Sequence, residues 1–121
     1  MAMLKLFISA RHAVRGIVLV FRKERNTRLE FFIGIIAILT GWWLQISLTE
    51  WCLVLFCFAG ILAAESFNTS IELLCDYHTR EIDPKIRDIK DIAAGAVMFM
   101  ALLSIIVGIV IFAPKIWLWT F

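Results

Sequence analysis

Apolar residues fall into three long runs along the 121-residue chain, and charged residues gather between them. The runs cover about residues 29–47, 51–77 and 84–112. Asp83-Pro84 is typical of an N-cap followed by proline at the first helical position, and Pro114 is expected to end the third helix. Because a helix rises 1.5 Å per residue, each run is long enough to cross nearly all of a hydrocarbon core of roughly 30 Å. The pattern predicts an all-α membrane protein with three transmembrane helices in one domain.

A fourth segment, residues 3–23, mixes apolar and basic residues. The apolar positions recur at the spacing of one helix face, and five Lys and Arg side chains interrupt them. This pattern is typical of an amphipathic helix that lies in the membrane interface with its basic side chains near lipid phosphates. The alternative is that most of these basic residues serve only as an electrostatic anchor.

Composition supports the membrane assignment, since 62% of the residues are hydrophobic and 18% are charged. The net charge of +2 is too small to suggest nucleic-acid binding. Seven of the twelve Lys and Arg residues precede the first span, four lie in residues 78–91, and the connection 46–50 has none. The positive-inside rule therefore predicts a cytoplasmic N-terminus and a cytoplasmic 78–91 loop.

The second run ends in a polar stripe. Glu65, Asn68, Glu72 and Asp76 follow one another at spacings of three, four and four, which places them within roughly 60° on one helix face. Counted from Trp51, Glu65 lies about 21 Å along the helix, inside the membrane, whereas the stripe ends in water. A carboxylate within a membrane span is costly and usually functional.

Charged residues at the cytoplasmic interface suggest a nucleotide site. Mg²⁺ typically takes one or two carboxylates plus substrate phosphates, and lysine binds phosphate as a point charge. Phosphoryl transfer also needs a base for the attacking hydroxyl, and Glu65 is deep enough to meet a lipid hydroxyl. There is no Walker A motif and no Gly-rich kinase loop. The charged residues expected at this interface are Glu24, Glu72, Asp76, Lys90 and Asp91.

Two other classes of function remain open on these residues. The chain could form a small proton- or ion-conducting oligomer with Glu65 as relay, which predicts conductance without ATP. It could also be a non-catalytic assembly subunit in which Asn68 and Glu72 join helices by hydrogen bonds. In that case Glu65→Gln would abolish assembly, whereas a kinase would assemble and lose turnover.

The spacing of the polar residues resembles the prokaryotic diacylglycerol kinase/undecaprenol kinase family. The stripe Glu65-x-x-Asn68-x-x-x-Glu72-x-x-x-Asp76 is followed fourteen residues later by Lys90-Asp91 and then by the small residues 93–96. The spacing of Gly16 and Glu24-Arg25-Asn26 agrees as well, so the resemblance extends from Ala10 to Lys115.

The resemblance implies a multi-pass lipid kinase of the bacterial inner membrane that uses ATP and Mg²⁺. It also implies a homotrimer with active sites shared between subunits. Carried over by position, Glu65 resembles the catalytic base, and Glu24 and Glu72 resemble the Mg²⁺ ligands. The Glu24-Arg25-Asn26 motif slightly favours undecaprenol over diacylglycerol as substrate. The positions that resemble nucleotide or active-site contacts are His12, Asn68, Asp76, Glu81, Lys90 and Asp91.

Overall fold

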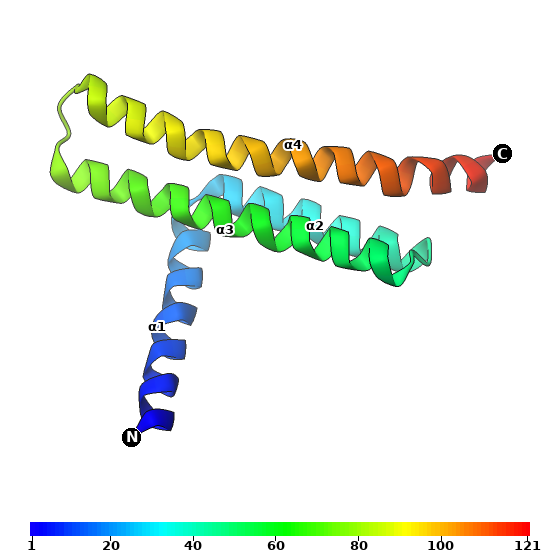
Figure 1. Cartoon of the computed structure of the whole chain (residues 1–121), viewed down its shortest axis with the longest axis horizontal. Helices are drawn as coiled ribbons and strands as arrows, with labels where there is room; N and C mark the ends of the chain where they lie inside the picture. Colours follow the sequence, from blue (N-terminus) through cyan, green and yellow to red (C-terminus); the bar gives the residue numbers. More distant parts are fainter.

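The structure, a computed structural model, describes all 121 residues as four α-helices with no strand, which confirms the all-α prediction. Helices α2, α3 and α4 run side by side, and α1 projects crosswise from them with the N-terminus at its far end (Figure 1). The loop that joins α3 to α4 lies at one end of the bundle. The helices are α1 (Ala2–Lys23), α2 (Arg25–Trp43), α3 (Leu48–His78) and α4 (Pro84–Thr120).

Two of the helices, α3 and α4, are long and apolar enough to cross a membrane by length and composition. Helix α2 is shorter, with 19 residues, and carries its charged residues in its first two turns. Only 12 of the 121 residues are buried within the chain, so most large apolar side chains face outward. A surface this apolar suits lipid or a protein partner rather than water.

The break between α1 and α2 lies at Glu24, whose backbone is extended (φ −107°, ψ 118°). Arg28 supports this joint, because its Nη1 donates to the carbonyl oxygens of Phe21 (2.6 Å) and Arg22 (3.2 Å). The last carbonyl groups of a helix have no partners within it, so this side chain satisfies two of them. The rings of Phe21 and Phe31 also pack edge to face, with centroids 5.2 Å apart. Arg28 and Phe31 of α2 therefore both stabilise the joint through contacts with the end of α1.

Helix α3 begins with a capping box. The Ser47 hydroxyl accepts a hydrogen bond from the Glu50 N–H (3.2 Å), and the Glu50 carboxylate accepts one from the Ser47 N–H (2.8 Å). Such reciprocal bonds satisfy two otherwise unpaired donors at the helix start. Glu50 also forms an ion pair with Lys115 of α4 (Oε2 to Nζ, 3.3 Å), which joins the two helices at this end. The preceding turn contains Gln45 with a positive φ of 52°.

Helix α4 begins as the sequence predicts. Asp83 is the N-cap, its carboxylate accepts a hydrogen bond from the Lys85 N–H (2.8 Å), and Pro84 occupies the first helical position. Proline suits this position because its missing N–H would have no helical partner there.

The other end of α4 corrects the predicted range of 84–112, in which Pro114 ends the helix. Pro114 instead lies inside α4, which continues beyond it. Proline removes one backbone hydrogen bond, but neighbouring helices can make this tolerable in a membrane protein. Here the last turns are held by the ion pair of Lys115 and by Trp119, whose ring packs on Trp43 with centroids 4.7 Å apart. These contacts with other helices explain why the helix does not stop.

A small apolar core lies near the connection between α2 and α3. Ile46, Val54 and Ile111 are buried together there, with Trp51 and Phe112 among the side chains packed around them. Nearer the α3–α4 loop, polar residues line the space between the helices instead.

Candidate active site

A polar cavity of about 440 Å³ lies between α2, α3 and α4 on the side of the bundle nearer the α3–α4 loop. Four of the residues that line it are glutamates and two are asparagines, whereas no Lys or Arg lines it. The lining residues are Glu24, Asn26, Glu30, Glu65, Asn68, Glu72, Ala94, Val97, Met98 and Ala101.

The structure gathers four of the residues predicted to form the site. Glu65, Asn68 and Glu72 come from one face of α3, because residues three and four apart lie on the same side of a helix. Glu24 reaches the cavity from the joint between α1 and α2, where the extended backbone lets α2 turn back beside α3. The predicted base and both predicted magnesium ligands therefore line one cavity within a single chain.

The electrostatics of the cavity favour a cation. Glu65 is 5% exposed, and the charges of Glu24 and Glu72 act on its carboxyl group. The Oδ1 atom of Asn68 is buried and has no hydrogen-bond partner within the chain. Clustered carboxylates without a lining Lys or Arg repel one another, so a bound cation would stabilise them.

The protein by itself does not complete a metal site, since no three His, Cys, Asp or Glu side chains converge closely enough to hold an ion. This arrangement fits Mg²⁺, which is usually held by one or two carboxylates with substrate phosphates and water as its other ligands.

Sequence reasoning missed Glu30, which lies on α2 and lines the cavity beside Glu65. Its carboxyl group interacts with that of Glu65, and its Oε2 atom is buried without a hydrogen-bond partner. The sequence did contain a signal for this residue. Glu30 falls inside the predicted span 29–47, and a carboxylate within a membrane span is usually functional, as for Glu65.

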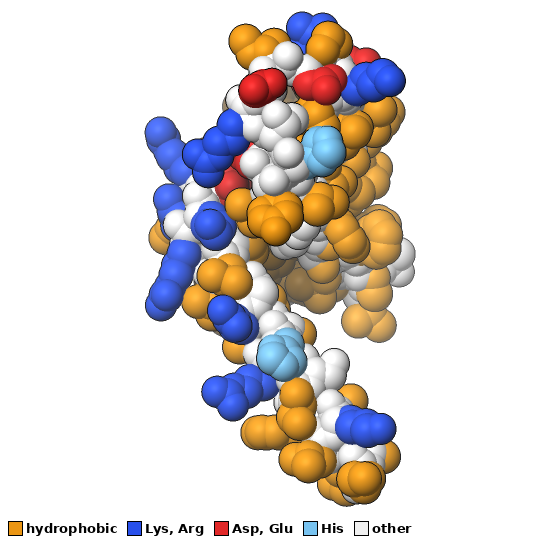
Figure 2. All heavy atoms as spheres, turned by 90° about the vertical axis from the view of Figure 1, so that its left-hand side faces the viewer, with side chains coloured by type: hydrophobic (Ala, Val, Ile, Leu, Met, Phe, Trp, Pro, Cys, Tyr) orange, Lys and Arg blue, Asp and Glu red, His pale blue; other side chains and the backbone are white.

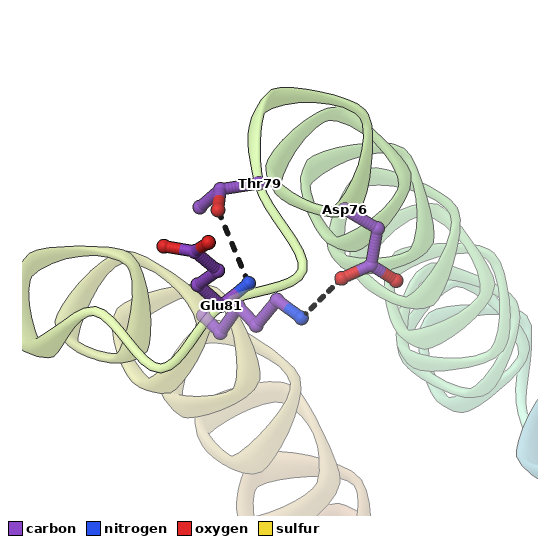
Figure 3. Close-up of polar contacts among 4 residues, drawn as sticks. Asp76, Thr79 and Glu81 are labelled. Carbon is purple, nitrogen blue, oxygen red and sulfur yellow. Dashed lines mark hydrogen bonds and ion pairs between the residues drawn. The ribbon is translucent and has the colours of Figure 1, made fainter.

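The other predicted residues do not line the cavity. Asp76 and Lys90 form an ion pair between α3 and α4 (Oδ1 to Nζ, 2.6 Å), and Figure 3 shows this contact beside the loop. In that loop the Glu81 N–H donates to the Thr79 hydroxyl (3.1 Å), and the Glu81 side chain is exposed. Asp91 is exposed on α4.

The remaining predicted contact, His12, lies in the projecting helix α1 and is exposed. Eleven residues separate it from the end of this helix, which corresponds to about 16 Å of helix. The cavity of its own chain therefore lies well beyond the reach of its side chain.

An apolar groove of about 360 Å³ adjoins the polar cavity. Hydrophobic side chains of α2, α3 and α4 form most of its walls, and Glu30 and Ala101 line both spaces. Gly34 and Gly108 also line the groove, and a Cβ atom added at Gly108 would meet nothing within 4 Å. The polar cavity and the apolar groove therefore share one carboxylate, that of Glu30.

Comparisons with known proteins agree with these features. Residues 11–112 match the family described as prokaryotic diacylglycerol kinase. The chain is 35% identical over 112 residues to an undecaprenol kinase of Bacillus subtilis, with 93% of this chain and 91% of the relative covered. It is 28% identical over 112 residues to a diacylglycerol kinase of Synechocystis, with 92% of this chain and 64% of the relative covered. No solved structure matches significantly.

The matched region runs from the middle of α1 into α4 and includes all the residues that line the polar cavity. The long apolar helices agree with a membrane-associated enzyme. The chain belongs to the prokaryotic diacylglycerol kinase family and is a lipid kinase with ATP as its co-substrate.

Proposed function

We propose that the polar cavity is the active site, where the γ-phosphoryl group of ATP is transferred to the hydroxyl of a membrane lipid alcohol. The observation that carries this proposal is the junction at Glu30, where the apolar groove meets the cavity that contains Glu65. A lipid alcohol has the matching form, because its hydrocarbon chain is apolar and its hydroxyl is polar. A lipid hydroxyl that enters the cavity from the groove would lie beside the buried carboxylate of Glu65.

Glu65 acts as the general base in this proposal. Its carboxylate accepts the proton of the lipid hydroxyl while the hydroxyl oxygen bonds to the γ-phosphorus. The bond from that phosphorus to the bridging oxygen breaks, and ADP leaves. Buried inside the cavity, Glu65 lies where a hydroxyl entering from the groove can meet it.

Glu24 and Glu72 are the residues that would hold Mg²⁺, and Asn68 adds an unpaired amide oxygen to the same wall. The ion would neutralise phosphate charge during transfer. The cavity has four carboxylates to attract it and no lining Lys or Arg to compete with it.

The groove supports undecaprenol as the preferred substrate. Undecaprenol has one hydrocarbon chain on one primary hydroxyl, whereas diacylglycerol has two chains, and the apolar groove that adjoins the cavity suits one chain. The higher identity to the Bacillus subtilis undecaprenol kinase points the same way.

The proposed membrane arrangement has α2, α3 and α4 as three spans of the bacterial inner membrane, with the N-terminus and the α3–α4 loop in the cytoplasm. The distribution of Lys and Arg supports this orientation. In Figure 2 many of the basic side chains lie along the left edge of the molecule and down the projecting helix, with hydrophobic side chains beside them, and others lie at the top. This pattern supports an interfacial position for α1. A homotrimer with shared active sites would cover part of the exposed apolar surface.

Transfer of labelled γ-phosphate from ATP with Mg²⁺, measured in mixed micelles, tests the proposal. Undecaprenol and diacylglycerol are compared side by side. We expect faster transfer to undecaprenol, and a loss of about a hundredfold or more in Glu65→Gln because the base is removed. Omitting Mg²⁺ should abolish transfer.

Glu50→Gln is the matched control, because it makes the same change on α3 about 22 Å from Glu65 along the helix. It should retain transfer. Normal turnover by folded, oligomeric Glu65→Gln protein would refute the base assignment. Absence of transfer to either lipid by folded wild-type protein would refute the proposed function.

A further inference from the structure

The ion pair between Asp76 and Lys90 lies next to the polar cavity. Asp76 follows the cavity residue Glu72 by four positions on α3, and Lys90 precedes the cavity residue Ala94 by four positions on α4. Residues four apart lie on the same helix face, about one turn from each other. The pair therefore bridges α3 and α4 one turn beyond the cavity walls, on the side of the loop (Figure 3).

The lining of the cavity supplies no cationic side chain for a nucleotide. Four carboxylates line the cavity with no Lys or Arg among them, so the phosphates of ATP need cations from its rim. Lys90 is a cation in register with the α4 wall, and a lysine ammonium binds phosphate as a point charge. Its side chain is 35% exposed, so a phosphate arriving from water can reach it. Within the chain, this ammonium donates a hydrogen bond to Asp76 Oδ1 (2.6 Å).

We propose that Asp76 is the counter-ion that positions Lys90 in the free enzyme, and that a terminal phosphate of ATP displaces it. This inference rests on the proposed function. One charge-assisted hydrogen bond is exchanged for another, and no covalent bond changes. The released Asp76 carboxylate returns to water at low cost, because its side chain is already 50% exposed. Asp76 is thus a positioning residue and a competitor of phosphate, rather than a ligand of the nucleotide.

The proposed exchange of Asp76 for phosphate predicts that a substitution at Asp76 tightens nucleotide binding, whereas substitutions in a binding site usually weaken it. Removing the Asp76 charge should strengthen nucleotide binding, because phosphate no longer competes with it for Lys90. Exposed ion pairs contribute little, so the effect should be about two- to fivefold. A direct nucleotide or metal ligand would show the opposite change on substitution.

The experiment measures the Kd of a non-hydrolysable ATP analogue with Mg²⁺ in detergent micelles. The proteins are the wild type, Asp76→Asn, Lys90→Met and the double variant. We expect Asp76→Asn to lower the Kd by about two- to fivefold and to lower KM for ATP without raising kcat. Lys90→Met should raise the Kd, and adding Asp76→Asn to it should change nothing further. Asp88→Asn, an exposed carboxylate on α4 with no ion pair, is the matched control.

Weaker binding by Asp76→Asn, whether or not Lys90 is present, would overturn the exchange and make Asp76 a direct ligand. Asp76→Ala provides a second variant with no amide group, and it should change the Kd in the same direction. Wild-type protein that neither binds the analogue nor transfers phosphate would refute the proposed function and the exchange together. Failure of the exchange alone is recognised by normal wild-type binding and transfer.

Discussion

At the scale of single residues, the cavity holds buried polar atoms that have no hydrogen-bond partner within the chain. Glu30 Oε2 and Asn68 Oδ1 are two such atoms, and the side chain of Glu65 is buried beside them. Unpaired polar atoms and clustered like charges cost stability. In the proposed active site, a bound ligand or ion would satisfy these groups.

Glu30→Gln tests whether this carboxyl group lowers the stability of the protein while it supports phosphate transfer. Gln keeps the shape of the side chain but removes one of four crowded carboxyl groups, so the unfolding midpoint should rise. Phosphate transfer should fall by about tenfold or more, because the junction between groove and cavity loses its charge. Transfer rate and thermal unfolding are measured in the same micelles, with Asp88→Asn as control because Asp88 is exposed and forms no ion pair. A lower midpoint with unchanged transfer would mean that Glu30 only supports packing.

At the scale of elements, close approach between α2 and α3 depends on Gly34. A Cβ atom added there would collide with the ring of Phe58. That ring also packs against Phe31, with centroids 5.7 Å apart, so it is not free to move away. Gly108 lines the same groove but has open space beside it. The two glycines therefore differ in what they contribute to the bundle.

Substitution by alanine should separate them. Gly34→Ala should destabilise the protein, because overpacking costs about 1–3 kcal/mol and exceeds the gain in helix propensity. Gly108→Ala creates no clash and should be neutral or stabilise by up to about 1 kcal/mol. Unfolding in a denaturing-detergent titration measures both. Equal stability of the two variants would show that the Phe58 ring moves aside at little cost.

At the scale of the whole molecule, one chain supplies all the carboxylates of the cavity but not every predicted nucleotide contact. Glu24, Glu65 and Glu72 line the same cavity, whereas His12 lies far along the projecting helix. If active sites are shared in an oligomer, His12 would serve the cavity of a neighbouring subunit.

Mixed oligomers test this arrangement. When Glu65→Gln and His12→Ala proteins, each impaired alone, are reassembled together in equal amounts, some sites should combine an intact Glu65 with an intact neighbouring His12. Transfer should recover to about a quarter of the wild-type rate, as expected for random association of two subunit types in a symmetric oligomer.

A mixture of Glu65→Gln and Glu72→Gln should stay inactive, because both changes fall in the cavity of one chain. Recovery in this control mixture, or none in the first mixture despite oligomer formation, would contradict sharing through His12. Full activity of His12→Ala alone would remove His12 from the site.

The sequence by itself determined the features that depend on neighbours along the chain. Helical periodicity predicts the all-α class, and the spacing of the α3 stripe places Glu65, Asn68 and Glu72 on one face. The start of α4 followed from Asp83 and Pro84, because capping involves only adjacent residues. The polar motif also indicated the family to which the chain belongs.

Only the tertiary structure decided how separate helices meet. It brought Glu24 and Glu30 beside Glu65, joined the groove to the cavity, and carried α4 past Pro114. These outcomes depend on packing between residues far apart in the sequence. Rules based on neighbouring residues in the sequence predict where a proline ends a helix or where a carboxylate is exposed. In the folded protein, contacts with an adjacent helix can change both outcomes.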